Sequence, residues 1–298
     1  MSDDLEHLHP SRREAVSWPT EERVKLILKD VWLEYPRARK ILATLEDLLS
    51  MPPSHRPTNA LIVGQSGNGK TTIVERFYHL HKMYQVESGE ARAPVVVMEM
   101  PARPNEKRFW IRLLTTLNIG HRETDPVPRL ENQALRILSG LETRMLIIDE
   151  IHNMLHRDRT TNPQEFLTVL KGLSNALRLP IVCVGIRESI RALHTDSQLS
   201  SRFEAHPLPR WKLDREFVAL LASFEKILPL AEPSGLTRAE TATRIHSMSG
   251  RTIDGVCRLL RKLATNAVRN GRERITERDF DEISWAPLDD YRRQADAL

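Results

Sequence analysis

The residues with the clearest chemical potential form a glycine-rich run that ends in lysine and threonine. Residues 64 to 71 read Gly-Gln-Ser-Gly-Asn-Gly-Lys-Thr, between the apolar run 60 to 63 and a helical pattern from Thr72 to His81. A loop of this composition turns its backbone N–H groups toward a phosphate. Its lysine reaches the outer phosphates, and its threonine hydroxyl can ligate Mg²⁺. The run therefore predicts a binding site for a nucleoside triphosphate.

We expect ATP and Mg²⁺ as the cofactors of this site. Lys70 is the expected catalytic cation, and Thr71 is an expected metal ligand. The residues expected to contact the nucleotide from this segment are Gly64, Gln65, Ser66, Gly67, Asn68, Gly69, Lys70, Thr71 and Thr72.

A second motif is an apolar run that ends in two acids. Residues 145 to 150 read Met-Leu-Ile-Ile-Asp-Glu, so Asp149 and Glu150 stand at the end of an expected strand. A carboxylate suits a hard cation, so Asp149 is the second expected Mg²⁺ ligand and a nucleotide-site residue. Glu150 is expected to orient water against the γ-phosphate. His152 follows closely, and it is either a capping or surface group or a further part of the site.

The elements that position these motifs alternate between strands and helices. Apolar runs at 95 to 98, 145 to 148 and 181 to 184 are separated by helical patterns at 105 to 117, 129 to 141 and 164 to 178. Continuous apolar strands that alternate with helices are typical of a parallel sheet covered on both faces. The fold class is therefore α/β.

The regions before and after this alternating segment are expected to be helical. Helical spacing covers residues 21 to 33 and 36 to 49, and a proline-rich connector follows at 51 to 58. Beyond residue 210, helices are expected at 214 to 228, 237 to 247, 252 to 270 and 276 to 284. The predicted domain organisation has three parts: an N-terminal helical extension and connector (1–58), a phosphate-loop core (59–209) and a helical lid domain (210–298).

Composition narrows the functional classes. The chain has 298 residues, of which 40% are hydrophobic, enough for a buried core. No stretch approaches the roughly 18 apolar residues of a membrane span, and the N-terminus is acidic where a signal peptide would be basic and then apolar. We expect a cytoplasmic protein without a membrane partner. With only two cysteines, a disulfide or zinc site is not expected.

The charge distribution indicates a polyanionic partner. The net charge is +4, yet residues 251 to 278 alone carry an excess of five positive charges. A charge run of this kind is either a solvated helix face or a nucleic-acid surface. Aromatic residues make up only 5% of the chain and do not interleave with the basic ones, so duplex binding through phosphates is expected over base stacking.

Together the motifs resemble those of the AAA+ ATPases, and residues 198 to 203 (Gln-Leu-Ser-Ser-Arg-Phe) supply the family's Ser-Arg-Phe box. The resemblance covers roughly residues 40 to 285, and it implies a five-stranded parallel sheet flanked by helices, with a C-terminal helical lid. It also implies that Arg202 is a catalytic arginine that projects into the nucleotide site of a neighbouring subunit. A surface cation near a helix end is the alternative reading of Arg202.

Two positions depart from the AAA+ pattern. The fourth strand of such proteins usually ends in a polar sensor, whereas this chain has Ile186 followed by Arg187. The arginine of the lid that senses nucleotide is either Arg251 or Arg258, of which Arg251 is favoured.

Flanking strings resemble the TniB-type transposition ATPases, relatives of TnsC and MuB. These strings are residues 35 to 38 (Tyr-Pro-Arg-Ala), 56 to 59 (Arg-Pro-Thr-Asn), 61 to 64, 69 to 71 and 146 to 153 (Leu-Ile-Ile-Asp-Glu-Ile-His-Asn). The resemblance implies an ATP-controlled DNA-binding regulator that assembles as an oligomer, a ring or helical filament, on duplex DNA. Such a regulator selects target DNA and recruits or activates a transposase of the integrase type. It would be nucleoid-associated when bound to DNA.

Arg103, Lys107 and Arg108 are the expected DNA contacts, because this segment lines the central channel of related DNA-encircling ATPases. A replication initiator or clamp-loader-like AAA+ ATPase would share every nucleotide motif. A small-molecule kinase on a phosphate-loop fold is a second alternative. The Ser-Arg-Phe box and the helical lid argue against it.

Overall fold

The computed structural model describes residues 5–155, 163–193 and 202–286, which belong to two compact units. One unit, here the core unit, spans Arg37–Pro209 and holds the sheet. The other, the helical unit, combines Met1–Pro36 with Arg210–Leu298. Within the described residues, no helix is both long and apolar enough to cross a membrane.

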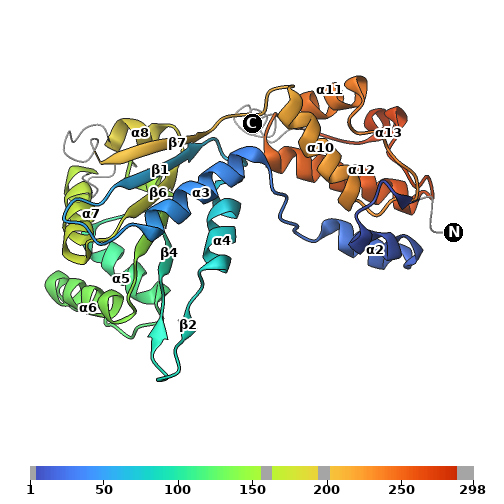
Figure 1. The fold of residues 1–298 in the computed structure, drawn as a ribbon. Coiled ribbons are helices and arrows are strands. Elements are labelled where there is room, and N and C mark those ends of the chain that lie inside the picture. Colours follow the sequence, from blue (N-terminus) through green and yellow to red (C-terminus); the bar gives the residue numbers. More distant parts are fainter. Residues whose placement is uncertain (1–4, 156–162, 194–201, 287–298) are drawn as a thin grey trace. The chain divides into compact units, whose positions relative to one another are not determined.

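The core unit is built on a five-stranded parallel sheet (Figure 1). Its order is β4-β5-β6-β1-β7. Every neighbouring pair is parallel. The predicted α/β fold with five parallel strands is therefore confirmed. The strands are β1 (Asn59–Gly64), β4 (Val95–Glu99), β5 (Met145–Asp149), β6 (Ile181–Gly185) and β7 (Phe203–Leu208).

Helices cover the sheet because its central strands are apolar on both faces. Leu146 and Ile148 of β5 belong to the apolar cluster on one face, together with side chains of α5, α6 and α7. Ile147 points the other way by the alternation of a strand and is also fully buried. The helix α4 contacts β1, β4 and β6. The helices are α3 (Pro36–Ser50), α4 (Lys70–Leu80), α5 (Glu106–Thr116), α6 (Val127–Gly140), α7 (Pro163–Leu177) and α8 (Glu188–Leu193).

Two strand features of the core unit were not predicted. The strand β7 has a mostly exposed or half-buried sequence with Pro207 near its end. It lies at the edge of the sheet, where an exposed pattern and a proline are tolerated. A short antiparallel hairpin, β2 (Tyr84–Gln85) with β3 (Ala91–Arg92), follows α4 and projects from the core unit in Figure 1.

The helical unit is organised around α12 (Ile253–Arg269), whose apolar face is almost wholly buried. It contacts α2, α11 and α13. The other elements of this unit are α1 (Pro10–Arg13), the 3₁₀ turn η2 (Glu14–Ser17), α2 (Thr20–Leu28), α10 (Arg215–Ile227), α11 (Ala239–Met248) and α13 (Glu277–Glu282).

The compact units group the N-terminal segment differently from the three-part division of the sequence. Residues 1–36 join the C-terminal helices because α2 packs on α12 and Arg23 is anchored there. The Arg23 side chain is 7% exposed and donates to both Glu273 carboxylate oxygens and to the Pro229 carbonyl. Residues 37–58 belong instead to the core unit.

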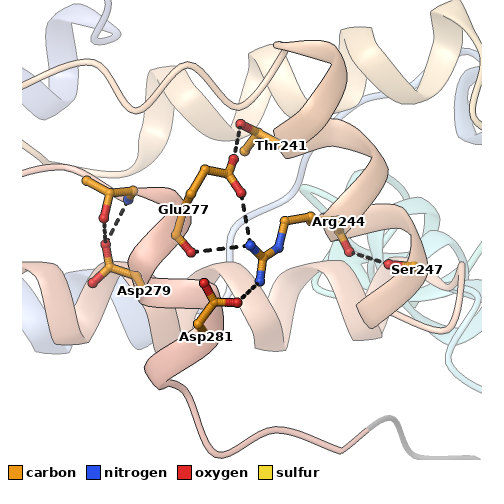
Figure 2. Close-up of polar contacts among 7 residues, drawn as sticks. Thr241, Arg244, Ser247, Glu277, Asp279 and Asp281 are labelled. Atoms are coloured by element: carbon orange, nitrogen blue, oxygen red, sulfur yellow. Dashed lines mark hydrogen bonds and ion pairs between the residues drawn. The ribbon is translucent and has the colours of Figure 1, made fainter.

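Ion pairs fasten α13 to α11, as Figure 2 shows. The Arg244 guanidinium on α11 donates to Glu277 and Asp281 of α13, and the Thr241 hydroxyl donates to the other Glu277 oxygen at 3.0 Å. Thr276 and Asp279 form a capping box at the start of α13. These contacts give the short α13 a fixed place, since six residues alone make a marginal helix.

Candidate functional site

The phosphate loop lies between β1 and α4. Gly67 and Gly69 have φ values of 75° and 81°, in the left-handed region that glycine tolerates. Gly69 caps α4, which begins at Lys70, so the loop ends at the positive end of a helix dipole. A sharp turn ahead of a helix N-terminus is the geometry of an anion site.

Lys70 is held inside this loop. Its Nζ donates to the carbonyl oxygens of Gly64 and Gln65 at 2.9 and 3.0 Å, and the residue is 7% exposed. Burial lowers the pKa of the Lys70 ammonium, while the Asp149 and Glu150 carboxylates act against that shift. The Lys70 ammonium is thus held at the loop, where phosphate oxygens of a bound nucleotide would form charge-assisted hydrogen bonds with it.

Close packing fixes the first turn of the loop. A Cβ added at Gly64 would lie 2.7 Å from the Leu208 carbonyl oxygen, so only glycine fits beside β7. The same carbonyl accepts a hydrogen bond from Asn68 Nδ2 at 2.7 Å. Asn68 Oδ1 is buried without a partner among the described residues. The Leu208 carbonyl at the end of β7 thus contacts the loop at two positions, Gly64 and Asn68.

The predicted metal ligands lie together. Thr71 Oγ1 donates to Asp149 Oδ2 at 2.7 Å, although the two residues are 78 positions apart. The other Asp149 oxygen accepts the Glu150 N–H at 2.7 Å. A hydroxyl and a carboxylate side by side are oxygen ligands of the kind that Mg²⁺ prefers, so these residues fit the metal that the fold implies.

Glu150 is placed by an unusual backbone conformation at the end of β5. Its φ of 54° lies in the left-handed region, which is uncommon for a residue with a side chain and clusters at functional sites. The Glu150 carboxylate lies 3.1 Å from His152 Nε2. His152 Nδ1 is buried without a hydrogen-bond partner among the described residues. His152 therefore contacts Glu150, the residue expected to orient water. The sequence alone left the role of His152 open.

The topology brings these groups to one edge of the sheet. Strands β1, β6 and β5 are neighbours and parallel, so the phosphate loop, Ile186 with Arg187, and the Asp149 to Glu150 pair all follow carboxyl ends. Ligands of open α/β sheets bind at this edge. Arg187 is exposed there, and Ile186 is half-buried.

Arg202 lies at the amino ends of the strands, opposite the carboxyl ends that carry the phosphate loop. It precedes β7, and its carbonyl accepts the Asn59 N–H at the start of β1. Its guanidinium donates to Asn175 Oδ1 of α7 at 3.0 Å. The rest of the predicted box, residues 198 to 201, lies outside the described residues. With strand β1 between them, Arg202 and the phosphate loop are on the order of 16 Å apart.

The candidate DNA contacts follow β4. Asn105 caps α5 by accepting the Arg108 N–H, and the Arg108 guanidinium donates to the Arg103 carbonyl at 3.1 Å. Arg103 and Arg108 are exposed, and Lys107 is half-buried. The three side chains thus gather at the start of α5.

The basic charges of the lid are largely neutralised within the helical unit. Arg261 pairs with Asp30 at 2.9 Å, and Arg269 pairs with Glu21 at 3.4 Å. Arg258 lies 3.9 Å from Asp254, with its guanidinium over the Trp285 ring. Arg272, Arg274 and Arg278 pair with Asp279, Glu232 and Glu282. The Lys262 ammonium donates to the neutral Ser284 carbonyl and keeps its charge. Arg251, at a φ of 62°, is exposed, and it stays the favoured lid candidate.

The sheet order, the phosphate loop and the acid pair on the neighbouring strand ends define an AAA+ phosphate-loop fold. The sequence matches the family model "Bacterial TniB protein" over residues 23–213. That match spans more than half of the chain, so the chain belongs to the TniB family. No curated protein matches it.

Similar solved structures share the fold. The ORC2 protein of Aeropyrum pernix, in ADPNP–ADP complexes, is 18% identical with a TM-score of 0.59, over 92% of this chain and 74% of that one. The ORC1 protein of Aeropyrum pernix, in complex with DNA, is 16% identical with a TM-score of 0.60, over 92% and 69%. Cdc6p of Pyrobaculum aerophilum is 18% identical with a TM-score of 0.57, over 84% and 67%.

Proposed function

We propose that this chain is an ATP-dependent DNA-binding regulator of transposition. In its ATP-bound form it assembles as an oligomer on duplex DNA, selects the target, and recruits or activates a transposase of the integrase type. The observation that carries this proposal is a nucleotide site whose phosphate loop, metal ligands and acid pair lie together, the Thr71 to Asp149 contact at 2.7 Å foremost, in a chain of the TniB family.

ATP hydrolysis follows from the chemistry of these groups. Lys70 and the N–H groups of the loop bind the β- and γ-phosphates, and Glu150 orients the attacking water. Thr71 and Asp149 would hold Mg²⁺, which when bound would neutralise charge on the transferring phosphoryl group. The contact with His152 limits where the Glu150 carboxylate can point.

The position of Arg202 supports a site shared between subunits. Arg202 lies at the amino ends of the strands, and the phosphate loop lies at their carboxyl ends. The Arg202 side chain therefore cannot reach a nucleotide bound to the same subunit. An arginine acting on a neighbour's nucleotide requires a head-to-tail interface, which generates rings or helical filaments. The oligomer and the catalytic role of Arg202 are thus one proposal.

Duplex DNA is the proposed polyanion, contacted by Arg103, Lys107 and Arg108. These side chains follow β4 at the same edge as the nucleotide site, so nucleotide-driven assembly could align them along a duplex. The ORC1 protein of Aeropyrum pernix, which shares the fold, is in complex with DNA. The neutralised charges of the lid make it the weaker candidate for phosphate contact.

The alternatives predict different dependences of ATP turnover. A transposition regulator should hydrolyse ATP faster with duplex DNA, independently of sequence, and DNA-bound protein should stimulate its transposase. A replication initiator, which the similar folds of ORC and Cdc6 proteins favour, should instead respond to particular origin sequences. A small-molecule kinase should turn over ATP only with a metabolite acceptor.

The test is steady-state ATP hydrolysis with no addition, with duplexes of unrelated sequence, and with a panel of small alcohols and amines. Stimulation by all duplexes supports the proposal. Stimulation by one duplex sequence alone favours the initiator, and stimulation by a metabolite alone overturns DNA-coupled function.

A further inference from the structure

A hollow in the core unit lies between residues 120 to 125 and the helix α6. Its volume is about 880 Å³. The α6 side of the hollow comes from positions i, i+3, i+4, i+7 and i+8, which share one face of a helix. Its lining includes His121, Arg122, Asp125, Arg129, Gln133 and Arg136. None of these residues belongs to the candidate nucleotide site or to the predicted DNA contacts.

The hollow carries positive charge that is not neutralised within the described part of the chain. Arg129 pairs with Asp125 at 3.4 Å, and the Asp125 side chain is 9% exposed. The side chains of Arg122 and Arg136 are exposed, and neither has an ion-pair partner among the described residues. This distinguishes the hollow from the lid, where most guanidinium groups already have carboxylate partners.

The walls of the hollow are fixed by hydrogen bonds. Gln133 Nε2 donates to the Gly120 carbonyl at 3.0 Å, which ties α6 to the loop. Asp125 Oδ2 accepts the Arg122 N–H at 3.1 Å, and the His121 ring lies 3.0 Å from the Ile119 carbonyl through Nδ1. The guanidinium groups of Arg122 and Arg136 therefore project from a backbone that needs no ordering on binding, which favours affinity.

We propose that this hollow docks an acidic, extended segment of a partner protein. The guanidinium groups of Arg122 and Arg136 would bind carboxylates as forks. The Asp125 oxygens are already taken by the Arg122 N–H and by Arg129, and the hollow also offers the amide oxygens of Asn132 and Gln133 as acceptors. A peptide satisfies these acceptors through its backbone N–H groups, whereas a phosphodiester backbone has no donor to give them.

The spacing of the arginines favours an extended partner. Arg129 and Arg136 are two turns apart on α6, a rise of about 10 Å. Three residues of an extended or polyproline-like peptide span about the same length. Carboxylates at every third position of a polyproline-like segment lie on one side of it, so they would meet Arg136 and Arg129, the latter shared with Asp125.

Fluorescence anisotropy tests the proposal with a labelled peptide of Glu-Pro-Ala repeats, and with its Gln-Pro-Ala counterpart as the uncharged probe. ATP is left out, and Lys70→Ala is included, so the result does not depend on the proposed nucleotide function. We expect wild type and Lys70→Ala to bind the glutamate peptide alike and to bind the glutamine peptide far less. The double variant Arg122→Gln with Arg136→Gln should lose about tenfold or more in affinity for the glutamate peptide.

The matched control is Arg274→Gln, which removes an exposed guanidinium that already pairs with Glu232 at 3.1 Å. It should bind the glutamate peptide as wild type does. A labelled duplex and inorganic tripolyphosphate complete the test. If wild type does not prefer the glutamate peptide, or if the double variant binds it unchanged, the proposal is overturned. It is equally overturned if the double variant loses only duplex or tripolyphosphate binding, which would make the hollow a phosphate surface.

Discussion

The substitution Gly64→Ala tests how the end of β7 braces the phosphate loop. The added methyl group would lie 2.7 Å from the Leu208 carbonyl oxygen and 3.0 Å from Leu208 Cβ. A backbone carbonyl cannot swing aside as a flexible side chain can, so β1 and β7 must separate. That movement carries the Leu208 carbonyl away from Asn68 Nδ2, to which it is bonded at 2.7 Å.

The expected loss of stability has two parts. Overpacking costs about 1 to 3 kcal/mol, and the weakened hydrogen bond adds about 1 kcal/mol, so the free energy of unfolding should fall by about 2 to 4 kcal/mol. For a unit of this size that corresponds to a Tm lower by about 5 to 15 °C. ATP affinity should fall as well, because Asn68 belongs to the loop.

The matched control is Gly172→Ala on α7. A Cβ there meets no atom within 4 Å, and its helical position favours alanine. That variant should gain about 0.5 to 1 kcal/mol in stability. Thermal unfolding and isothermal titration with ATP measure both variants. If Gly64→Ala melts and binds ATP like wild type, the close approach of β7 does not constrain the loop.

Further predictions concern catalysis and acid stability. Glu150→Gln should bind ATP yet hydrolyse it at least about a hundredfold more slowly, and wild-type turnover would assign the role elsewhere. Arg202→Ala and Lys70→Ala should each be inactive, whereas their mixture should recover activity at interfaces that pair an intact loop with an intact Arg202; an inactive mixture would refute action in trans. Arg23→Ala should cost roughly 3 kcal/mol in denaturant unfolding at pH 7, and an unchanged midpoint would contradict the anchoring role. Burial raises the pKa of Glu273, but Arg23 and a backbone N–H outweigh it and leave that pKa lowered. This stabilisation is therefore present above about pH 4.5, and it is lost as the pH falls through the folded pKa, so the variant should show less acid sensitivity there.

The nucleotide site could be predicted from sequence because its signals are local. Local conformation follows from local sequence here: the glycines and Lys70 predict the loop, and the apolar run before Asp149 predicts a strand. A parallel sheet then requires their strand ends to share an edge. The sequence places His152 two residues after Glu150, but it does not predict that the two side chains are in contact. The direction of the His152 ring depends on the turn that follows β5.

Features that depend on distant partners were not predictable in this way. The lid looked basic in a sequence window, but its counter-charges include Asp30 and Glu21, more than two hundred residues earlier. The strand β7 lacks an apolar pattern because it is an edge strand. The hollow beside α6 arises from a loop folding back, so that Arg122 joins Arg136 without any periodic signal linking them.

We propose above that ATP drives assembly of this chain on duplex DNA through phosphate contacts. The most direct measurement is duplex affinity across a salt series with a non-hydrolysable ATP analogue. It compares wild type, a triple alanine variant at Arg103, Lys107 and Arg108, and a lid variant without Arg258, Arg261 and Lys262. Affinity of the wild type should fall by about 0.9 log unit per log unit of salt for each neutralised phosphate, and the triple variant should flatten that slope. If only the lid variant flattens the slope, the lid is the DNA surface. If wild-type affinity depends on neither salt nor the ATP analogue, ATP-driven assembly on DNA through phosphate contacts is refuted.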